Sequence, residues 1–190
     1  MTLLFATHNQ NKVKEIASLL PLGYELRSLC DLNFHEEIPE TSDTIDGNSL
    51  LKAQYLFEKL RKPCIAEDTG LEIESLQGRP GVRSARYAGE PTNANANINK
   101  VLGEMKGQQN RAAKFKTVIT HYFAQGYVQY VGICEGEILE TPRGTDGFGY
   151  DPIFLPKGCN HSFAQMRLEE KNVFSHRKKA FEKFLADLKK

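Results

Sequence analysis

The chain has 190 residues, of which 40% are hydrophobic and 26% charged, as in an ordinary globular protein with a substantial core. Its 25 basic and 24 acidic side chains leave a net charge of +1, which argues against nucleic acid or an anionic membrane as a partner. No apolar run approaches the roughly 20 residues of a membrane helix. Met1 to His8 lack the basic start of a signal peptide, and the four cysteines show no metal-ligand spacing. We expect a single domain over residues 1–190, cytoplasmic and with reduced thiols.

The first predicted element is a buried strand over Thr2 to Ala6, followed by a polar loop and a helix that Pro21 ends. A helix amino terminus presents free N–H groups that can hold phosphate. Thr7, Asn9 and Lys12 add a hydroxyl, an amide and a cation at this point. Ordinary N-capping beside a solvated lysine is the alternative interpretation. The loop lacks the glycine spacing of a P-loop or a dinucleotide fingerprint.

A half-buried strand over residues 24–29 precedes a second helix, which is predicted from about Thr44 to Arg61. The apolar residues at helical spacing that mark its expected core face are Leu50, Ala53, Phe57 and Leu60. Asn48 and Lys52 lie four positions apart, so they share one face away from that stripe and could look into a cleft. A solvated lysine is the alternative for Lys52.

The stretch from Pro63 to Gly89 combines a short apolar strand with charged side chains. The strand ends at Glu67 and Asp68, which are expected to serve different purposes because adjacent strand residues point to opposite faces. Three arginines follow this strand, namely Arg79, Arg83 and Arg86. The combination indicates a metal-assisted reaction on an anionic substrate. A surface hairpin with solvated charges is the alternative.

The middle of the chain predicts a helix and a hairpin. A third helix starts at Pro91-Thr92, and its alternating asparagines indicate a solvated outer surface. Two β-rich runs, residues 113–123 and 127–134, are joined at Gln125-Gly126. This pattern predicts an antiparallel hairpin, whose second arm could continue to residue 139.

A glycine-rich loop with aromatic residues lies between Pro142 and Pro156. Its glycines allow the backbone to approach a ligand closely, and Phe148 or Tyr150 could stack on a planar base. A tight turn with core aromatic residues is the alternative interpretation.

The last helix is predicted to follow Ser175, with His176 and Arg177 in its first turn. An arginine at this end opposes the helix dipole, so a purely structural purpose for it is hard to find. A histidine there tends to be neutral and can donate or accept a hydrogen bond. Together with Lys12, Asp68 and the aromatic loop, these residues favour an enzyme that handles nucleotides.

The same segments resemble the inosine triphosphate pyrophosphatases, a family that removes non-standard purine nucleoside triphosphates from the nucleotide pool. The resemblance covers nearly the whole chain in family order. The matching stretches are residues 6–15, 48–53, 66–71, 78–89, 147–154 and 169–177.

The resemblance implies an α/β fold with a mixed β-sheet flanked by helices, two lobes around a long central cleft, and a homodimer. It implies Mg²⁺-dependent hydrolysis of dITP, ITP and XTP to the monophosphate and pyrophosphate. Asp68 and Lys52 match its catalytic positions, and Glu40 and Asp68 match its metal carboxylates. The residues that match its substrate contacts are Thr7, His8, Asn9, Gln10, Asn11, Lys12, Thr69, Phe148, Gly149, Tyr150, Asp151, Lys171, His176 and Arg177.

Elementary chemistry agrees with these roles. Mg²⁺, Lys12 and Lys52 would neutralise charge on the attacked phosphate, and Asp68 could take a proton from the attacking water. Hypoxanthine and xanthine have an acceptor, the 6-oxo group, to which His176 and Arg177 could donate. Adenine has a donor at the same position.

Some positions depart from the common pattern of the family. These departures bear on two properties that the resemblance implies, the geometry around the metal and the preference among substrates. The chain has Glu67-Asp68-Thr69 where two aspartates and a serine are frequent, Gly47 where glutamate is common, and Lys178 where glycine often follows. One alternative is therefore the same fold acting on modified pyrimidine or standard nucleotides, as in the septum-inhibitor-like pyrophosphatases. Another is a nucleotide-binding regulator without turnover, although the presence of Glu40, Lys52 and Asp68 together argues against it.

Overall fold

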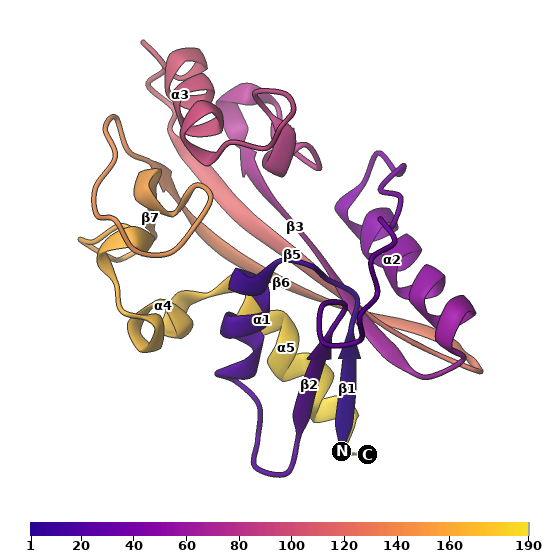
Figure 1. The fold of residues 1–190 in the computed structure, drawn as a ribbon. Helices are drawn as coiled ribbons and strands as arrows, with labels where there is room; N and C mark the ends of the chain where they lie inside the picture. Colours follow the sequence, from indigo (N-terminus) through magenta and orange to yellow (C-terminus); the bar gives the residue numbers. More distant parts are fainter. Residues whose placement is uncertain (190) are drawn as a thin grey trace. The chain divides into compact units, whose positions relative to one another are not determined.

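The structure is a computed structural model that describes residues 1–189 (Figure 1). Its helices and strands, in chain order, are β1 (Thr2–Phe5), α1 (Gln10–Ala17), β2 (Glu25–Ser28), α2 (Ile45–Leu60), β3 (Cys64–Ile73), β4 (Pro80–Gly81), α3 (Ala94–Glu104), β5 (Ala112–Phe123), β6 (Gly126–Ile138), β7 (Phe154–Pro156), α4 (Leu168–Phe174) and α5 (His176–Asp187). Among these residues, no helix has both the length and the hydrophobicity needed to cross a bilayer.

The strands form one mixed sheet in the order β2-β1-β3-β5-β6-β7, with β4 paired to β3. β1 runs parallel to β2 and β3, whereas the β3–β4 and β6–β7 pairs are antiparallel. β5 and β6 are neighbours separated only by Ala124 and Gln125, a connection too short for parallel strands. The predicted mixed sheet and hairpin are confirmed, and β6 continues to Ile138 as expected.

The chain divides into two compact units. The first unit contains Met1–Asp68, Thr117–Gly132 and the chain from Arg177 onward. The second unit contains Thr69–Lys116 and Ile133–His176. β3, β5 and β6 contribute residues to both units. The single domain and the cleft between two lobes stay predictions.

The core of the first unit follows from the alternation of side chains along β1. Leu3 and Phe5 point to the face covered by α1 and α5, and Leu4 and Ala6 to the face covered by α2 (Figure 1). The helix residues buried with the first pair are Ile16, Ala180, Phe181 and Phe184. Those buried with the second pair are Ala53 and Leu56. Helices therefore cover both faces of this part of the sheet, as predicted.

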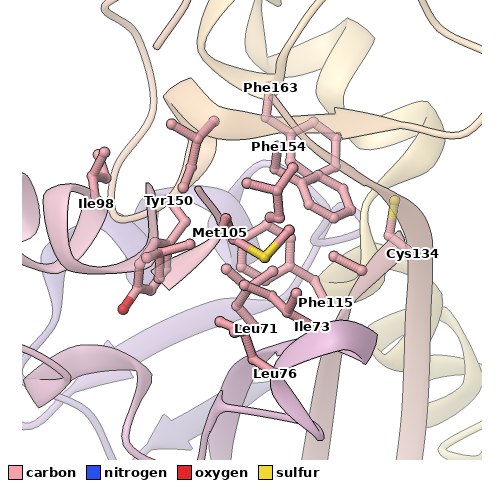
Figure 2. Close-up of a cluster of buried hydrophobic side chains, with 14 of the residues drawn as sticks. Leu71, Ile73, Leu76, Ile98, Met105, Phe115, Cys134, Tyr150, Phe154 and Phe163 are labelled. Carbon is pink, nitrogen blue, oxygen red and sulfur yellow. The ribbon is translucent and has the colours of Figure 1, made fainter. Parts of the chain in front are cut away.

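The second unit has a core that is rich in aromatic rings (Figure 2). The Phe115 ring lies 4.6 Å from that of Phe154 and 6.1 Å from that of Phe163, measured between centroids. Phe154 and Phe163 are themselves 5.3 Å apart. The three rings come from β5, from β7 and from the segment before α4, so they tie distant parts of the chain together.

The predicted asparagine surface of α3 is wrong at Asn97, which is buried with 4% of its surface exposed. Its side-chain oxygen accepts the Ala88 N–H at 2.7 Å, and its amide donates to the Ala85 carbonyl at 2.9 Å. Asn93 caps the helix by accepting the Ala96 N–H. Helical spacing could not reveal that one asparagine satisfies the backbone of a distant turn.

Replacing Asn97 with alanine should lower the free energy of unfolding by about 1–3 kcal/mol, because buried backbone groups lose their partners. Asn95→Ala, at an exposed position of the same helix, should change it by less than about 0.5 kcal/mol. Urea denaturation followed by far-UV circular dichroism measures both, since the chain lacks tryptophan. Equal destabilisation by the two variants would show that the hydrogen bonds of Asn97 do not stabilise the fold.

Candidate functional site

The loop after β1 has the capped helix start that the sequence predicts. The Asn9 side-chain oxygen accepts the N–H groups of Asn11 and Lys12 at 3.0 and 3.3 Å. Thr7 Oγ1 accepts the Asn9 N–H at 3.1 Å. His8, Asn9, Gln10 and Asn11 are exposed, so the loop presents polar side chains to solvent. The N-capping interpretation holds for Asn9, and the loop also keeps the exposure that a phosphate contact requires.

The Lys12 side chain is not solvated, because only 15% of it is exposed and its Nζ lies 3.4 Å from Glu67 Oε1. Burial lowers the pKa of Lys12, and the neighbouring Lys52 and Arg177 lower it further. Glu67 and Asp68 raise this pKa but do not offset the burial. Lys12 is thus a buried amino group beside other charged side chains, and when it is protonated its attraction to an anion is little screened by water.

Lys52 is shared by two carboxylates. Its Nζ donates to Asp68 Oδ1 at 2.7 Å and to Glu40 Oε1 at 2.9 Å. Burial lowers the pKa of Lys52, but Asp68 and Glu40 outweigh this effect and raise the pKa overall. Burial raises the pKa of Asp68, although Lys52 and Lys12 oppose the change. An ammonium group from the middle of α2 and two carboxylates, one from the middle of β3 and one from the loop before α2, therefore converge.

The predicted core stripe of α2 is confirmed at Ala53, and Phe57 and Leu60 are partly buried against the same cluster. The fully buried face is nevertheless displaced from this stripe toward polar residues. The buried residues of this helix are Ile45, Asn48, Ser49, Lys52, Ala53 and Leu56. Polar side chains can face inward because each has a partner. Asn48 Oδ1 accepts the Ser42 N–H at 2.9 Å, and Ser49 donates to the Val118 carbonyl at 3.0 Å. Asn48 and Lys52 lie on the inward face of the helix, whereas the sequence predicted them on a face next to the core stripe.

Glu67 and Asp68 have different partners, as the alternation of strand residues predicts. Glu67 is buried and forms a two-point contact with Arg177, whose Nε and Nη2 lie 2.7 and 2.8 Å from its oxygens. Arg177 Nη1 also contacts Glu15, and the guanidinium is 1% exposed. Burial lowers the pKa of Arg177, but Glu67 and Glu15 outweigh it and raise this pKa. The interpretation of this stretch as a solvated surface hairpin is wrong for both carboxylates.

Arg177 has a structural purpose that the sequence did not reveal, since it neutralises two buried glutamates. Glu15 was not among the predicted site residues. It lies three positions after Lys12 on α1, and this helical spacing places both side chains on one face. The spacing was the signal in the sequence that could have found Glu15.

In the second unit, Asp151 and Lys171 form a buried ion pair with 2.6 Å between Oδ2 and Nζ. Asp151 Oδ2 also accepts the Phe148 N–H at 2.9 Å. The Lys171 ammonium lies 5.2 Å from the ring centroids of both Phe148 and Phe163. The fold thus brings the aromatic loop together with Lys171, as a substrate site built from both requires.

The glycine loop itself is shaped by Asp151. Gly147 has φ +74°, and a Cβ at this position would lie 2.2 Å from Asp151 Oδ2, so only glycine fits. Gly149 also has a positive φ of +61°. The Tyr150 ring is buried, and its hydroxyl donates to the Ser84 carbonyl at 2.8 Å. Tyr150 is a core aromatic residue and not an exposed stacking surface, whereas Phe148 is partly exposed.

His176 and Thr69 differ in exposure. The His176 imidazole is buried and stacks on Phe115 with 4.7 Å between ring centroids and 14° between planes. Thr69 follows Asp68 on β3 and is partly exposed. Neither Phe115 nor Phe163 was predicted at the site, because aromatic residues in a β-rich run give no signal beyond a core position.

A cavity of about 810 Å³ lies elsewhere in the second unit and includes none of the predicted site residues. Its charged rim contains two ion pairs, Glu72 with Lys114 and Glu135 with Lys157. Within residues 1–189, no group of three or more His, Cys, Asp or Glu side chains gathers in a metal-binding arrangement. The buried ion pairs, and not this cavity, mark the predicted chemistry.

The family model for the Ham1 family matches residues 3–187. The chain belongs to the Ham1 family. It is 53% identical to the dITP/XTP pyrophosphatase of Christiangramia forsetii over the full length of both chains. It is 45% identical to the dITP/XTP pyrophosphatase of Bacillus subtilis, with 95% of this chain and 93% of that protein covered.

Solved structures of Ham1 proteins have the same fold. The Staphylococcus aureus Ham1 protein is 34% identical with a TM-score of 0.90, over 100% of this chain and 98% of that chain. A dITP/XTP pyrophosphatase from Mycobacterium abscessus is 36% identical with a TM-score of 0.79, over 97% and 99% of the two chains. The predicted family and α/β fold are confirmed.

Replacing Arg177 with methionine should lower the free energy of unfolding by about 3–5 kcal/mol, because Glu67 and Glu15 would be left buried without their cation. The double variant Arg177→Met/Glu67→Gln should recover part of this loss. Lys179→Met, at an exposed position of α5, serves as the control and should change stability by less than about 0.5 kcal/mol. Urea denaturation measures the free energy of unfolding of each variant. If Arg177→Met were as stable as this control, Arg177 would not be needed to neutralise Glu67 and Glu15.

Proposed function

We propose that this Ham1 family chain hydrolyses dITP, ITP and XTP to the nucleoside monophosphate and pyrophosphate. The observation that carries the proposal is the buried Lys52 shared by Glu40 and Asp68, in a chain 53% identical to a protein named dITP/XTP pyrophosphatase. A water molecule would attack the α-phosphorus, and the bond from this phosphorus to the bridging oxygen would break. Pyrophosphate is then the leaving group.

Glu40 and Asp68 fit a Mg²⁺ ion. Mg²⁺ prefers carboxylate oxygens and is commonly held by one or two carboxylates together with water and substrate phosphates. The oxygens of these two residues already converge on one cation, Lys52 Nζ. When bound, the ion would supply positive charge to the phosphate oxygens.

The chain's own residues would act on the phosphates and on the water. Lys12 at the start of α1 and Lys52 in the middle of α2 are close enough to influence one another, and both would attract the triphosphate. Thr7 to Asn11 and Thr69 would add polar contacts. Asp68 would hold the water in line and accept its proton, because it is a buried carboxylate at hydrogen-bond distance from Lys52.

Selection of the base would rest on the second unit. A 6-oxo purine offers an acceptor where adenine offers a donor, and Lys171 and His176 can supply donors. A base with the wrong pattern would leave buried groups unpaired, at a cost of about 1–3 kcal/mol for each group. Phe148, Gly149 and the backbone around Tyr150 and Asp151 would contact the purine plane and edge. The Nε, Nη1 and Nη2 atoms of Arg177 already contact carboxylates. A contact between Arg177 and the base therefore stays a prediction.

Two further properties belong to the proposal. An enzyme that removes non-standard nucleotides acts where the nucleotide pool is used, which supports a cytoplasmic location. The resemblance supports a homodimer. Size-exclusion chromatography with light scattering tests the dimer directly.

The purified protein with Mg²⁺ should convert ITP, dITP and XTP to monophosphate and pyrophosphate, and ATP or dCTP far more slowly. Asp68→Asn should lower kcat by about 10²–10⁴-fold, because the water loses its base. Asp43→Asn, at an exposed position before α2, should leave kcat unchanged. Ion chromatography of the products distinguishes the alternatives. Turnover of modified pyrimidine or standard nucleotides would change the substrate class, and binding without products would indicate a regulator.

In the metal-free protein the pKa of Asp68 should lie above 3.8, the usual pKa of an aspartate, because burial raises it. Lys52→Met should raise this pKa further, since removing the cation favours the protonated carboxyl. Lys59→Met, an exposed lysine of the same helix, is the control that should leave the pKa of Asp68 in place. NMR titration of the carboxyl carbons without Mg²⁺ measures all three proteins, and a pKa unmoved by Lys52→Met would contradict the pairing of Lys52 with Asp68.

A further inference from the structure

The His176 imidazole lies flat against an aromatic ring that no part of the proposed function uses. Phe115, on β5, stacks on it with 4.7 Å between centroids and 14° between planes. Phe163 lies 6.3 Å from the same imidazole at 37°. His176 is 2% exposed, so these rings, and not solvent, form much of its surroundings.

The orientation of a histidine ring is fixed only when neighbouring groups pack against it. The torsion about its last bond joins an sp³ to an sp² carbon, and its distribution is broad, so the side chain's own rotamer does not set the imidazole plane. The backbone at the start of α5 places the Cβ atom, and packing must do the rest. A near-parallel ring in contact restricts rotation about this bond more than an inclined ring at a longer distance does.

Phe115 is itself held firmly. Its ring is 6% exposed and packs against Phe154 at 4.6 Å and 58° (Figure 2). It also stacks with Phe163 at 6.1 Å and 26°. The stacked Phe115 ring therefore links the orientation of the imidazole to the core of the second unit, while Phe163 contacts the imidazole at a longer distance.

We propose that Phe115 is a positioning residue: its ring fixes the imidazole plane of His176 and thereby sets the preference for 6-oxo purines over adenine. This inference rests on the proposed function, in which His176 contacts the base. Selectivity by hydrogen bonding depends on the direction of the donor, and a donor that rotates freely can adapt to either base.

The test compares two leucine substitutions in one aromatic cluster. Phe115→Leu keeps an apolar side chain but removes the stacked ring. Phe154→Leu is the matched control, because Phe154 is buried beside Phe115 and, within the described residues, has no ring contact with His176. Phe115→Met is a second variant of different shape, in case Phe115→Leu does not fold.

Two quantities are measured for each protein. The first is the ratio of kcat/KM for ITP to that for ATP, which Phe115→Leu should lower by roughly 2- to 10-fold, the size of effect that an aromatic pair carries. The second is the proton chemical shift of the His176 ring, assigned with His176→Gln. The stacked Phe115 ring shields these protons, so they should move downfield in Phe115→Leu and Phe115→Met. Phe154→Leu should change both quantities less than Phe115→Leu does, because it leaves the Phe115 ring in place against the imidazole.

The outcomes separate the inference from the function beneath it. If the His176 resonance moves in Phe115→Leu but the ITP/ATP ratio does not, the inference is wrong. Equal effects of Phe115→Leu and Phe154→Leu would also overturn it, because they would reflect a loosened core. If His176→Gln leaves the ratio unchanged, the proposed base contact of His176 fails instead. Absence of pyrophosphate release from ITP by the unsubstituted protein would refute the proposed function itself.

Discussion

Two adjacent carboxylates on β3 organise the first unit, because each binds a cation from a different helix. Asp68 pairs with Lys52 of α2, and Glu67 pairs with Arg177 of α5 and with Lys12 of α1. Buried ion pairs contribute little net stability, since the loss of hydration offsets most of the attraction, but breaking one is costly. Their value lies in placing charge where water cannot screen it. The strand that crosses the core therefore also fixes the positions of the cations that the proposed reaction needs.

The charge of this set has a further consequence. Three cations, Lys12, Lys52 and Arg177, face four carboxylates, which are Glu15, Glu40, Glu67 and Asp68. With all groups ionised, 3 − 4 gives a charge of −1. The carboxylates therefore offset the attraction that Lys12 and Lys52 would exert on a triphosphate, and a divalent cation would change the charge of the set to +1. The balance of charges in this set supports the proposal that the metal and the nucleotide bind together.

The sequence predicted the elements of the fold well because its apolar residues follow the periods of strands and helices. It failed where a polar side chain is buried against a distant partner. α2 turns Asn48, Ser49 and Lys52 inward. For Asn48 and Lys52 the sequence predicted a face beside the core, and for Ser49 it predicted nothing. Asn97 behaves in the same way on α3. Pattern arguments treat burial as a property of one residue, whereas burial of a polar group depends on whether the rest of the chain supplies its hydrogen bonds.

The candidate site likewise has residues that the sequence predicted and contacts that it could not predict. The loop of Lys12, the carboxylates of β3 and the aromatic loop could each be found from local chemistry. The role of Arg177 could not, because Glu67 lies 110 positions away in the sequence. The Phe115–His176 stack is equally invisible, since it joins β5 to α5. Local chemistry identifies which groups are able to act, and only the fold determines which partners hold them in place.

The two lysines of the first unit differ in a way that bears on substrate binding. Two carboxylates hold Lys52 and raise its pKa, so its charge is already compensated. Lys12 shares Glu67 with the bidentate Arg177, and its pKa is lowered, so its charge is compensated only in part. An anion near Lys12 would raise its pKa and restore the missing interaction. Binding of a phosphate at the capped start of α1 would therefore be coupled to the charge of Lys12, while Lys52 keeps Glu40 and Asp68 in position.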